Sequence, residues 1–191
     1  MPRALIVAEA PVVPEHCRPG LPACGYSVVD EIDDPRRLVR RAVAIEPDVI
    51  VIASQSPSKK FCESTRALDA HAPHAVMLFT AAIDHASIEA AAQAGVHAYI
   101  VDGFSARRLL VQIDVARARF RVMHGLKSAL ADAEGKLEER KLVDRAKGIL
   151  MQSRQMSEDQ AYTSLRKLAM EKKLKLSAIA EQIITASKLL V

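Results

Sequence analysis

Five short runs of apolar residues in the first half of the chain alternate with segments of helical periodicity. The apolar runs cover residues 4–7, 26–29, 49–52, 75–79 and 98–101, and helical segments cover 35–45, 59–71 and 83–94. Continuous apolar strands separated by helices are typical of a parallel sheet that is covered on both faces. Residues 1–120 are therefore predicted to form an α/β domain with a five-stranded parallel sheet.

The connection between the first two apolar runs differs from the others because it is rich in proline. Pro11, Pro14, Pro19 and Pro22 all fall in it. Proline lacks a backbone donor and clashes with the preceding helical turn, so a regular helix is unfavourable there. We expect this crossover to be short or distorted.

The helical pattern then continues from residue 105 to residue 151 without a proline. Within it, a seam of side chains follows heptad spacing: Met123, Leu126, Leu130, Ala133, Leu137 and Arg140. A 3-4-3-4 spacing is that of a coiled coil. Residues 121–139 are thus predicted to be a coiled-coil-like linker. The seam either pairs with a second copy of the chain, which we prefer, or packs against helices of the same chain.

The last quarter of the chain, residues 140–191, has apolar positions at three- and four-residue spacing that predict three short amphipathic helices. Ser157 followed by Gln160 predicts a capping box at the start of the second helix, with Glu158 and Asp159 placed favourably in its first turn. Because a single amphipathic helix cannot bury its apolar stripe alone, the three are expected to pack into a bundle.

Charge is distributed unevenly between these regions. Residues 1–125 contain 14 basic and 14 acidic side chains, whereas residues 126–191 contain 13 and 9 and so carry the whole net charge of +4. The window 140–175 alone holds 10 basic and 4 acidic residues. A neutral body joined to a basic module is typical of a nucleic-acid-binding protein, although a solvated helical surface has the same composition.

Other classes of protein fit the sequence poorly. The three cysteines, Cys17, Cys24 and Cys62, form no CxxC pair, and their odd number argues against a disulfide framework. No signal peptide and no apolar run of membrane-spanning length is evident, so a cytoplasmic protein is expected. His71 and His74 lack a third ligand nearby in sequence. We therefore expect neither a metal nor a cofactor.

Dispersed motifs in the last quarter resemble the ANTAR domain, the RNA-binding module of transcription antitermination regulators of the AmiR/NasR/NasT class. The matching segments are Ala146-Lys147-Gly148-Ile149-Leu150-Met151, Ala161-Tyr162, Leu165-Arg166-Lys167, Ala169-Met170 and Ile179-Ala180-Glu181. The resemblance covers about fifty residues and is closest to NasT-like regulators. It implies that the ligand is a hairpin in a nascent leader transcript and that binding prevents a terminator from forming.

The N-terminal domain resembles the receiver domain of response regulators, which has a flavodoxin-like fold. The receiver pattern requires an acidic pair after the first strand, an aspartate ending the third, a threonine or serine after the fourth and a lysine after the fifth. The matching positions are Ala8-Glu9, Ala53, Thr80 and Asp102. Only Glu9 and Thr80 agree with it. The resemblance therefore implies a pseudo-receiver that accepts no phosphoryl group, and no enzyme activity is predicted.

Candidate RNA contacts lie on the basic module. They are Arg145, Lys147, Tyr162, Arg166, Lys167, Lys172 and Lys173. Basic side chains attract phosphates, whereas bases stack on aromatic or arginine planes. Tyr162 is either such a platform or a core residue. Lys147 and Arg166 are expected to be exposed, so that their replacement leaves folding intact, and Gly148 is expected to allow close helix packing.

The resemblance implies that the input is a ligand-sensing regulatory protein of the nitrate or amide type. The heptad seam predicts a homodimer, and the lack of a long apolar run predicts that the chain does not enter a membrane. Two alternatives remain open. A DNA-binding response regulator would require a helix-turn-helix with a tight turn. A protein-interaction adaptor that uses the helical tail would not require the basic charge.

Overall fold

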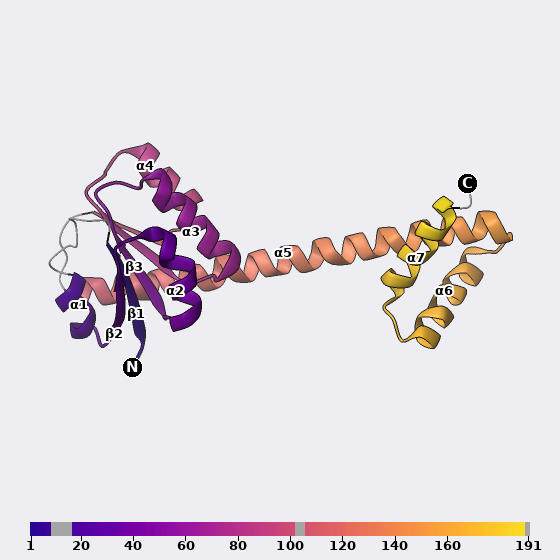
Figure 1. The fold of residues 1–191 in the computed structure, drawn as a ribbon, viewed down its shortest axis with the longest axis horizontal. Coiled ribbons are helices and arrows are strands. Elements are labelled where there is room, and N and C mark those ends of the chain that lie inside the picture. The colour runs from indigo at the N-terminus through magenta and orange to yellow at the C-terminus, as the bar shows by residue number, and fades with distance from the viewer. Residues whose placement is uncertain (9–16, 102–105, 190–191) are drawn as a thin grey trace. The chain divides into compact units, whose positions relative to one another are not determined.

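The computed structural model describes residues 1–8, 17–101 and 106–189, and it divides into two compact units, residues 1–125 and 126–191 (Figure 1). Unit 1 is built around five strands: β1 (Arg3–Ala8), β2 (Ser27–Ile32), β3 (Val49–Ala53), β4 (Val76–Thr80) and β5 (Ala98–Val101). All pairings are parallel, and the strand order is β2-β1-β3-β4-β5. The predicted parallel sheet is confirmed, although several strands begin or end one to three residues away from the apolar runs.

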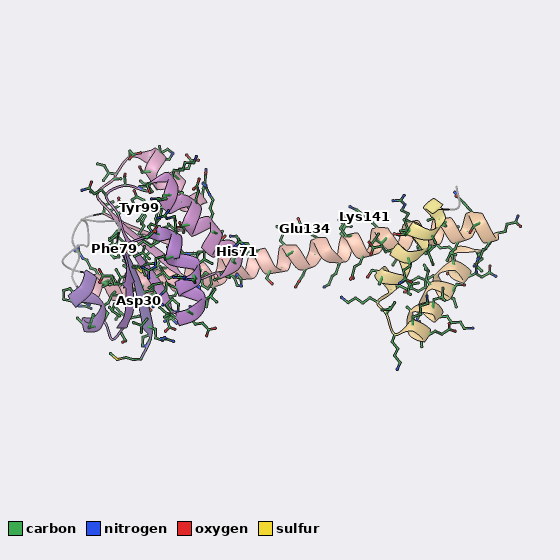
Figure 2. All side chains as sticks on the ribbon, viewed as in Figure 1. Asp30, His71, Phe79, Tyr99, Glu134 and Lys141 are labelled. Atoms are coloured by element: carbon green, nitrogen blue, oxygen red, sulfur yellow. The ribbon has the colours of Figure 1, made fainter. Side chains whose placement is uncertain are left out.

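Alternate residues of each strand point to opposite sides of this sheet, so helices cover both of its faces. Figure 2 shows the side chains that fill the space between the sheet and the helices of this unit. On one face, Leu5, Ile50 and Leu78 pack with α2 (Leu38–Ile45), α3 (Lys59–His71) and α4 (His85–Gln93). On the other face, Ile6 and Val51 pack with α1 (Cys17–Ala23) and with the first turns of α5 (Ala106–Arg154). β3 and β4 are buried along their whole lengths, as the continuous apolar runs predict.

The first crossover contains a helix of only 7 residues, with Pro22 inside it. The expectation of a short first helix is therefore confirmed.

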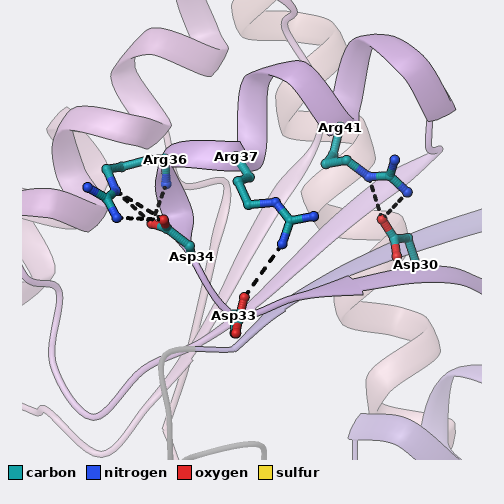
Figure 3. A network of polar contacts seen from close by, with 6 residues as sticks. All are labelled: Asp30, Asp33, Asp34, Arg36, Arg37 and Arg41. Carbon is teal, nitrogen blue, oxygen red and sulfur yellow. Dashed lines mark hydrogen bonds and ion pairs between the residues drawn. The ribbon is translucent and has the colours of Figure 1, made fainter.

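The turn from β2 into α2 is fixed by a row of ion pairs, which Figure 3 shows. The helix predicted to start at residue 35 begins with a single 3-10 turn, η1 (Pro35–Arg37), before α2 starts. Arg36 lies 2.8 Å from Asp34, which also caps this turn, and Arg37 lies 3.8 Å from Asp33. Arg41 pairs with Asp30 of β2. Exposed pairs of this kind contribute little stability one by one, so their main effect is to orient the turn.

Unit 2 is a three-helix bundle. Its first helix is the end of α5, which runs unbroken for 49 residues, followed by α6 (Glu158–Lys172) and α7 (Leu176–Leu189). The bundle core is made by Ala146 and Leu150 of α5, Leu165 of α6, and Ile179 and Ile184 of α7. The capping box of Ser157 and Gln160 is present as predicted. The first of the three expected helices is thus continuous with the linker helix.

The heptad seam lies on the surface of α5. Met123, Leu126, Leu130 and Leu137 are 51%, 63%, 60% and 53% exposed. None of the four belongs to a hydrophobic core of the described residues. Within each unit, the seam therefore does not pack against helices of the same unit, and pairing with a second copy stays a prediction.

Candidate nucleic-acid interface

A groove of about 610 Å³ opens on the surface of unit 2, where the end of α5 meets the starts of α6 and α7. Its α5 wall is a stripe at three- and four-residue spacing, so these side chains share one face of the helix. The lining residues are Lys136, Glu139, Arg140, Val143, Asp144, Lys147, Tyr162, Lys175, Leu176 and Ser177. Four of them are basic and two are acidic. The groove therefore has a net positive charge and suits an anionic ligand.

Lys147 joins two helices at one end of this groove. Its Nζ donates to the Asp144 carboxylate at 2.7 Å and to the Glu158 carboxylate at 2.6 Å, and its side chain is only 15% exposed. Glu158 is the first residue of α6, so Lys147 holds the start of α6 against α5. The expectation that Lys147 is exposed is wrong, because the packing of α6 brings a second carboxylate onto its amine.

The pKa shifts of Lys147 and Asp144 keep both groups charged around neutral pH. Hydrogen bonding to Asp144 and then to Glu158 raises the pKa of Lys147, and the hydrogen bond from Lys147 lowers the pKa of Asp144. A lowered carboxyl pKa contributes stability that is lost as the pH falls through the folded value. A raised amine pKa contributes stability that is lost as the pH rises through its folded value.

Tyr162 lies on the α6 side of the groove, one helical turn after Glu158, and is 44% exposed. It does not belong to the buried core of the bundle. Of the two alternatives for this residue, the structure therefore favours an accessible ring. Arg166, one turn further along α6, is exposed but does not line the groove.

Lys147 and Tyr162 are the two members of the predicted set that meet in this groove. Lys172 lies instead beside a second hollow of about 210 Å³ between α6 and α7, lined also by Leu168 and Ile183. Lys173 forms the left-handed C-cap of α6 (φ 54°). Arg145, Arg166 and Lys167 are exposed at other positions. The structure thus separates residues that charge alone placed together.

Sequence reasoning missed three basic residues of the groove: Lys136, Arg140 and Lys175. The positions 136, 140, 143 and 147 carry a helical spacing that identifies the α5 wall. Lys175 gave no such signal, because it precedes α7 and reaches the groove only through the folding of the bundle.

Gly148 does not have the role expected from the sequence. A Cβ added at this position meets no atom within 4 Å. Close helix packing therefore does not require glycine here.

The carboxyl ends of β1, β3 and β4 show what remains of a receiver site. Ala8 and Ala53 are register partners on neighbouring strands, and both are buried. The Thr80 hydroxyl donates to the carbonyl of Gln55 at 2.8 Å and accepts from the amide of Ala82 at 3.2 Å. These three positions hold no carboxylate; Glu9 and Asp102 lie outside the described residues.

Other polar groups of unit 1 have structural partners. Asp48 lies before β3, at the end of the sheet opposite Ala53, and accepts from the backbone amide of Arg3 at 2.7 Å. The Nδ1 atoms of His71 and His74 lie 2.9 and 2.7 Å from backbone carbonyls. Across residues 1–8, 17–101 and 106–189, no cluster of three potential metal ligands occurs. The same described residues contain no helix with the length and apolar content to cross a bilayer.

Comparison with known proteins agrees with this division of the chain. The ANTAR domain family matches residues 131–184. The transcriptional regulatory protein PdtaR of Mycobacterium tuberculosis is 29% identical over 160 residues, which cover 84% of this chain and 78% of that protein. The nitrate regulatory protein of Klebsiella oxytoca is 36% identical over 77 residues, covering 40% of this chain and 19% of that protein.

The fold of unit 1 also has solved counterparts. The signal receiver domain of a modulated diguanylate cyclase from Desulfovibrio desulfuricans aligns with a TM-score of 0.55 and 21% identity, covering 64% of this chain and 98% of that one. Unit 1 therefore has the receiver fold. Residues 131–184 therefore carry the ANTAR domain, and the chain as a whole is similar to transcriptional regulatory proteins.

Proposed function

We propose that this regulator binds hairpin RNA in nascent leader transcripts through the groove of unit 2 and thereby prevents a terminator from forming. The observation that carries the proposal is the groove itself. It combines four basic side chains with a half-exposed tyrosine, and all of its lining residues lie within the segment that matches the ANTAR domain.

The residues of the groove divide into two kinds of contact. Lys136 has no ion pair among the described residues, and Arg140 and Lys175 make only loose ones, at 3.9 and 4.0 Å. Their charges are available to phosphates, which supply affinity and little sequence discrimination. Tyr162 offers a ring on which an unpaired loop base can stack. Lys147 keeps α6 in place beside them.

We propose that the regulator works in the cytoplasm as a homodimer, with residues 1–120 as a pseudo-receiver, 121–139 as a coiled-coil-like linker and 140–191 as the RNA-binding domain. The exposed seam of Met123, Leu126, Leu130 and Leu137 supports pairing along α5. One continuous helix through the linker would let a change in unit 1 reach the bundle.

The input to unit 1 is proposed to be a partner protein and not phosphorylation. Ala53 offers no nucleophile, Ala8 offers no metal ligand, and the Thr80 hydroxyl is bonded to a neighbouring loop. The similarity to the nitrate regulatory protein supports a ligand-sensing partner of the nitrate or amide type. Unit 1 is accordingly proposed to have no catalytic activity.

Gel-shift titration of leader hairpin RNA against duplex DNA of matched sequence tests the proposal. We expect the native chain to prefer the RNA. Arg140→Ala and Lys175→Ala should each weaken hairpin binding. Each should also lower the slope of log affinity against log salt concentration by about one for each phosphate that is no longer bound. Lys167→Ala, an exposed charge outside the groove, is the matched control. Preference for DNA, or equally weakened binding in the control, would overturn the assignment.

A further inference from the structure

A separate hollow lies on unit 1, at the edge of the sheet where β3 and β4 begin. It measures about 230 Å³ and is far along the sheet from Ala53, which ends β3. Its lining residues are Pro47, Asp48, Pro73, His74, Ala75, Arg117, Phe120 and Arg121. All of them belong to unit 1. The hollow takes no part in the RNA groove or in the receiver positions.

Existing contacts hold the polar groups of this hollow in fixed positions. Arg117 donates to the Tyr26 hydroxyl at 3.1 Å and lies 3.7 Å from the Asp48 carboxylate. Asp48 also accepts from the amide of Arg3. The Nδ1 of His74 lies 2.7 Å from the carbonyl of Ala72; because a carbonyl can only accept, Nδ1 carries the hydrogen and Nε2 is left for another partner.

The rings on this side of α5 also pack against one another. Phe120 meets the ring of His97 edge-on at 5.4 Å and stacks on His124 at 5.5 Å with 15° between the planes. Arg119 donates to the carbonyl of His97 at 3.2 Å and so fastens α5 to the start of β5. The wall of the hollow is therefore ordered by several independent contacts before any ligand arrives.

The charge of the hollow selects the sign of its ligand. Asp48 is already paired with Arg117 and a backbone amide, whereas Arg121 is exposed, one turn beyond Arg117, and makes no ion pair among the described residues. The hollow thus presents the guanidinium of Arg121 beside the imidazole of His74. The guanidinium of Arg117 contributes only in part, because it also pairs with Asp48. An anion is the complementary ligand, because an arginine fork binds either a carboxylate or a phosphate through two hydrogen bonds.

The size and the lining of the hollow distinguish between these two kinds of anion. A volume of about 230 Å³ is below the range of about 300–1,000 Å³ typical of small-molecule pockets. Pro47, Pro73, Ala75 and Phe120 supply apolar surface beside the charges. An RNA backbone would bring repeated charges toward Asp48 and would leave this apolar surface unused. The lining fits an acidic side chain that is followed by an apolar one.

We propose that this hollow is the docking point for an acidic–apolar peptide segment of the protein partner that controls the regulator. The proposal refines the partner named under the proposed function and rests on that part of it. It does not depend on RNA binding, because none of its residues lies in unit 2.

Amide NMR on the full-length, ¹⁵N-labelled chain tests this proposal with two capped hexapeptides. One alternates Glu with Leu, and the other has Gln in place of every Glu. We expect saturable shifts at Asp48, His74, Phe120 and Arg121 with the Glu peptide and none with the Gln peptide. Equal shifts with both peptides, or no shifts with either, would overturn the proposal without affecting the RNA assignment.

Two substitutions on α5 then locate the binding site. Arg121→Glu should weaken binding of the Glu peptide at least tenfold. Arg107→Glu, an exposed arginine on the same helix outside the hollow, should leave it unchanged. Equal effects of the two would mean a general decrease of positive charge and would refute a built site. Leader hairpin RNA that shifts the same amides and displaces the peptide would assign this surface to RNA instead.

Discussion

Replacing two leucines of the seam with glutamate should convert the proposed homodimer into a folded monomer. Leu130 and Leu137 are 60% and 53% exposed and do not contribute to a hydrophobic core of the described residues. The double substitution Leu130→Glu/Leu137→Glu therefore removes little packing within one chain. In a dimer, the same change places charges in an apolar seam, which is strongly unfavourable.

The size of the effect follows from the exposed fractions. Complete burial of a leucine side chain contributes about 1.5–3 kcal/mol. Slightly more than half of the surface of each leucine is exposed in one chain, so its burial in a dimer would contribute about 1 kcal/mol per residue. Two leucines in each of two chains give about 4 kcal/mol, or nearly a thousandfold in the dimer dissociation constant. Repulsion between the introduced carboxylates would add to this effect.

Sedimentation equilibrium measures the predicted change, and circular dichroism measures folding. Ser128→Glu/Ala131→Glu is the matched control, because it adds the same charge to α5 at exposed positions outside the seam. We expect the control to sediment like the native chain. If the seam variant remains dimeric, the interface lies elsewhere. A seam variant that loses helical content in circular dichroism would show that these leucines pack within the chain.

Three other predictions concern single sites. Lys147→Ala should lower both the melting temperature and the RNA affinity, whereas Lys136→Ala should lower the RNA affinity alone. The difference in melting temperature between Lys147→Ala and the native chain should shrink as the pH falls through the carboxyl range, because Asp144 then takes up a proton. Tyr162→Ala should weaken hairpin binding by about 1–3 kcal/mol in gel shifts, with Tyr162→Phe close to native because the ring is kept; equal weakening in both variants would refute stacking. Acetyl phosphate with Mg²⁺ should leave no acid-labile modification on the native chain or on Ala53→Asp, which restores a nucleophile without the rest of the site; stoichiometric phosphorylation by mass spectrometry would contradict this.

The sequence by itself determined the elements that depend on local periodicity and local chemistry. Apolar runs of four to five residues predicted the parallel sheet of unit 1, and Ser157 with Gln160 predicted the start of α6. The helical pattern from residue 105 to residue 151 predicted the extent of α5, which ends three residues later. These features could be read from the chain because each depends on residues only a few positions apart.

Only the tertiary structure decided which charged side chains act together. Lys147 is far along the chain from Lys175, yet both line one groove, and Glu158 makes Lys147 a link between two helices. Composition predicted a basic surface, but it could not tell a free lysine from a paired one. The reason is physical: the partners of a charge are set by how α5, α6 and α7 pack on their shared core, and the periodicity of each helix leaves that packing undetermined.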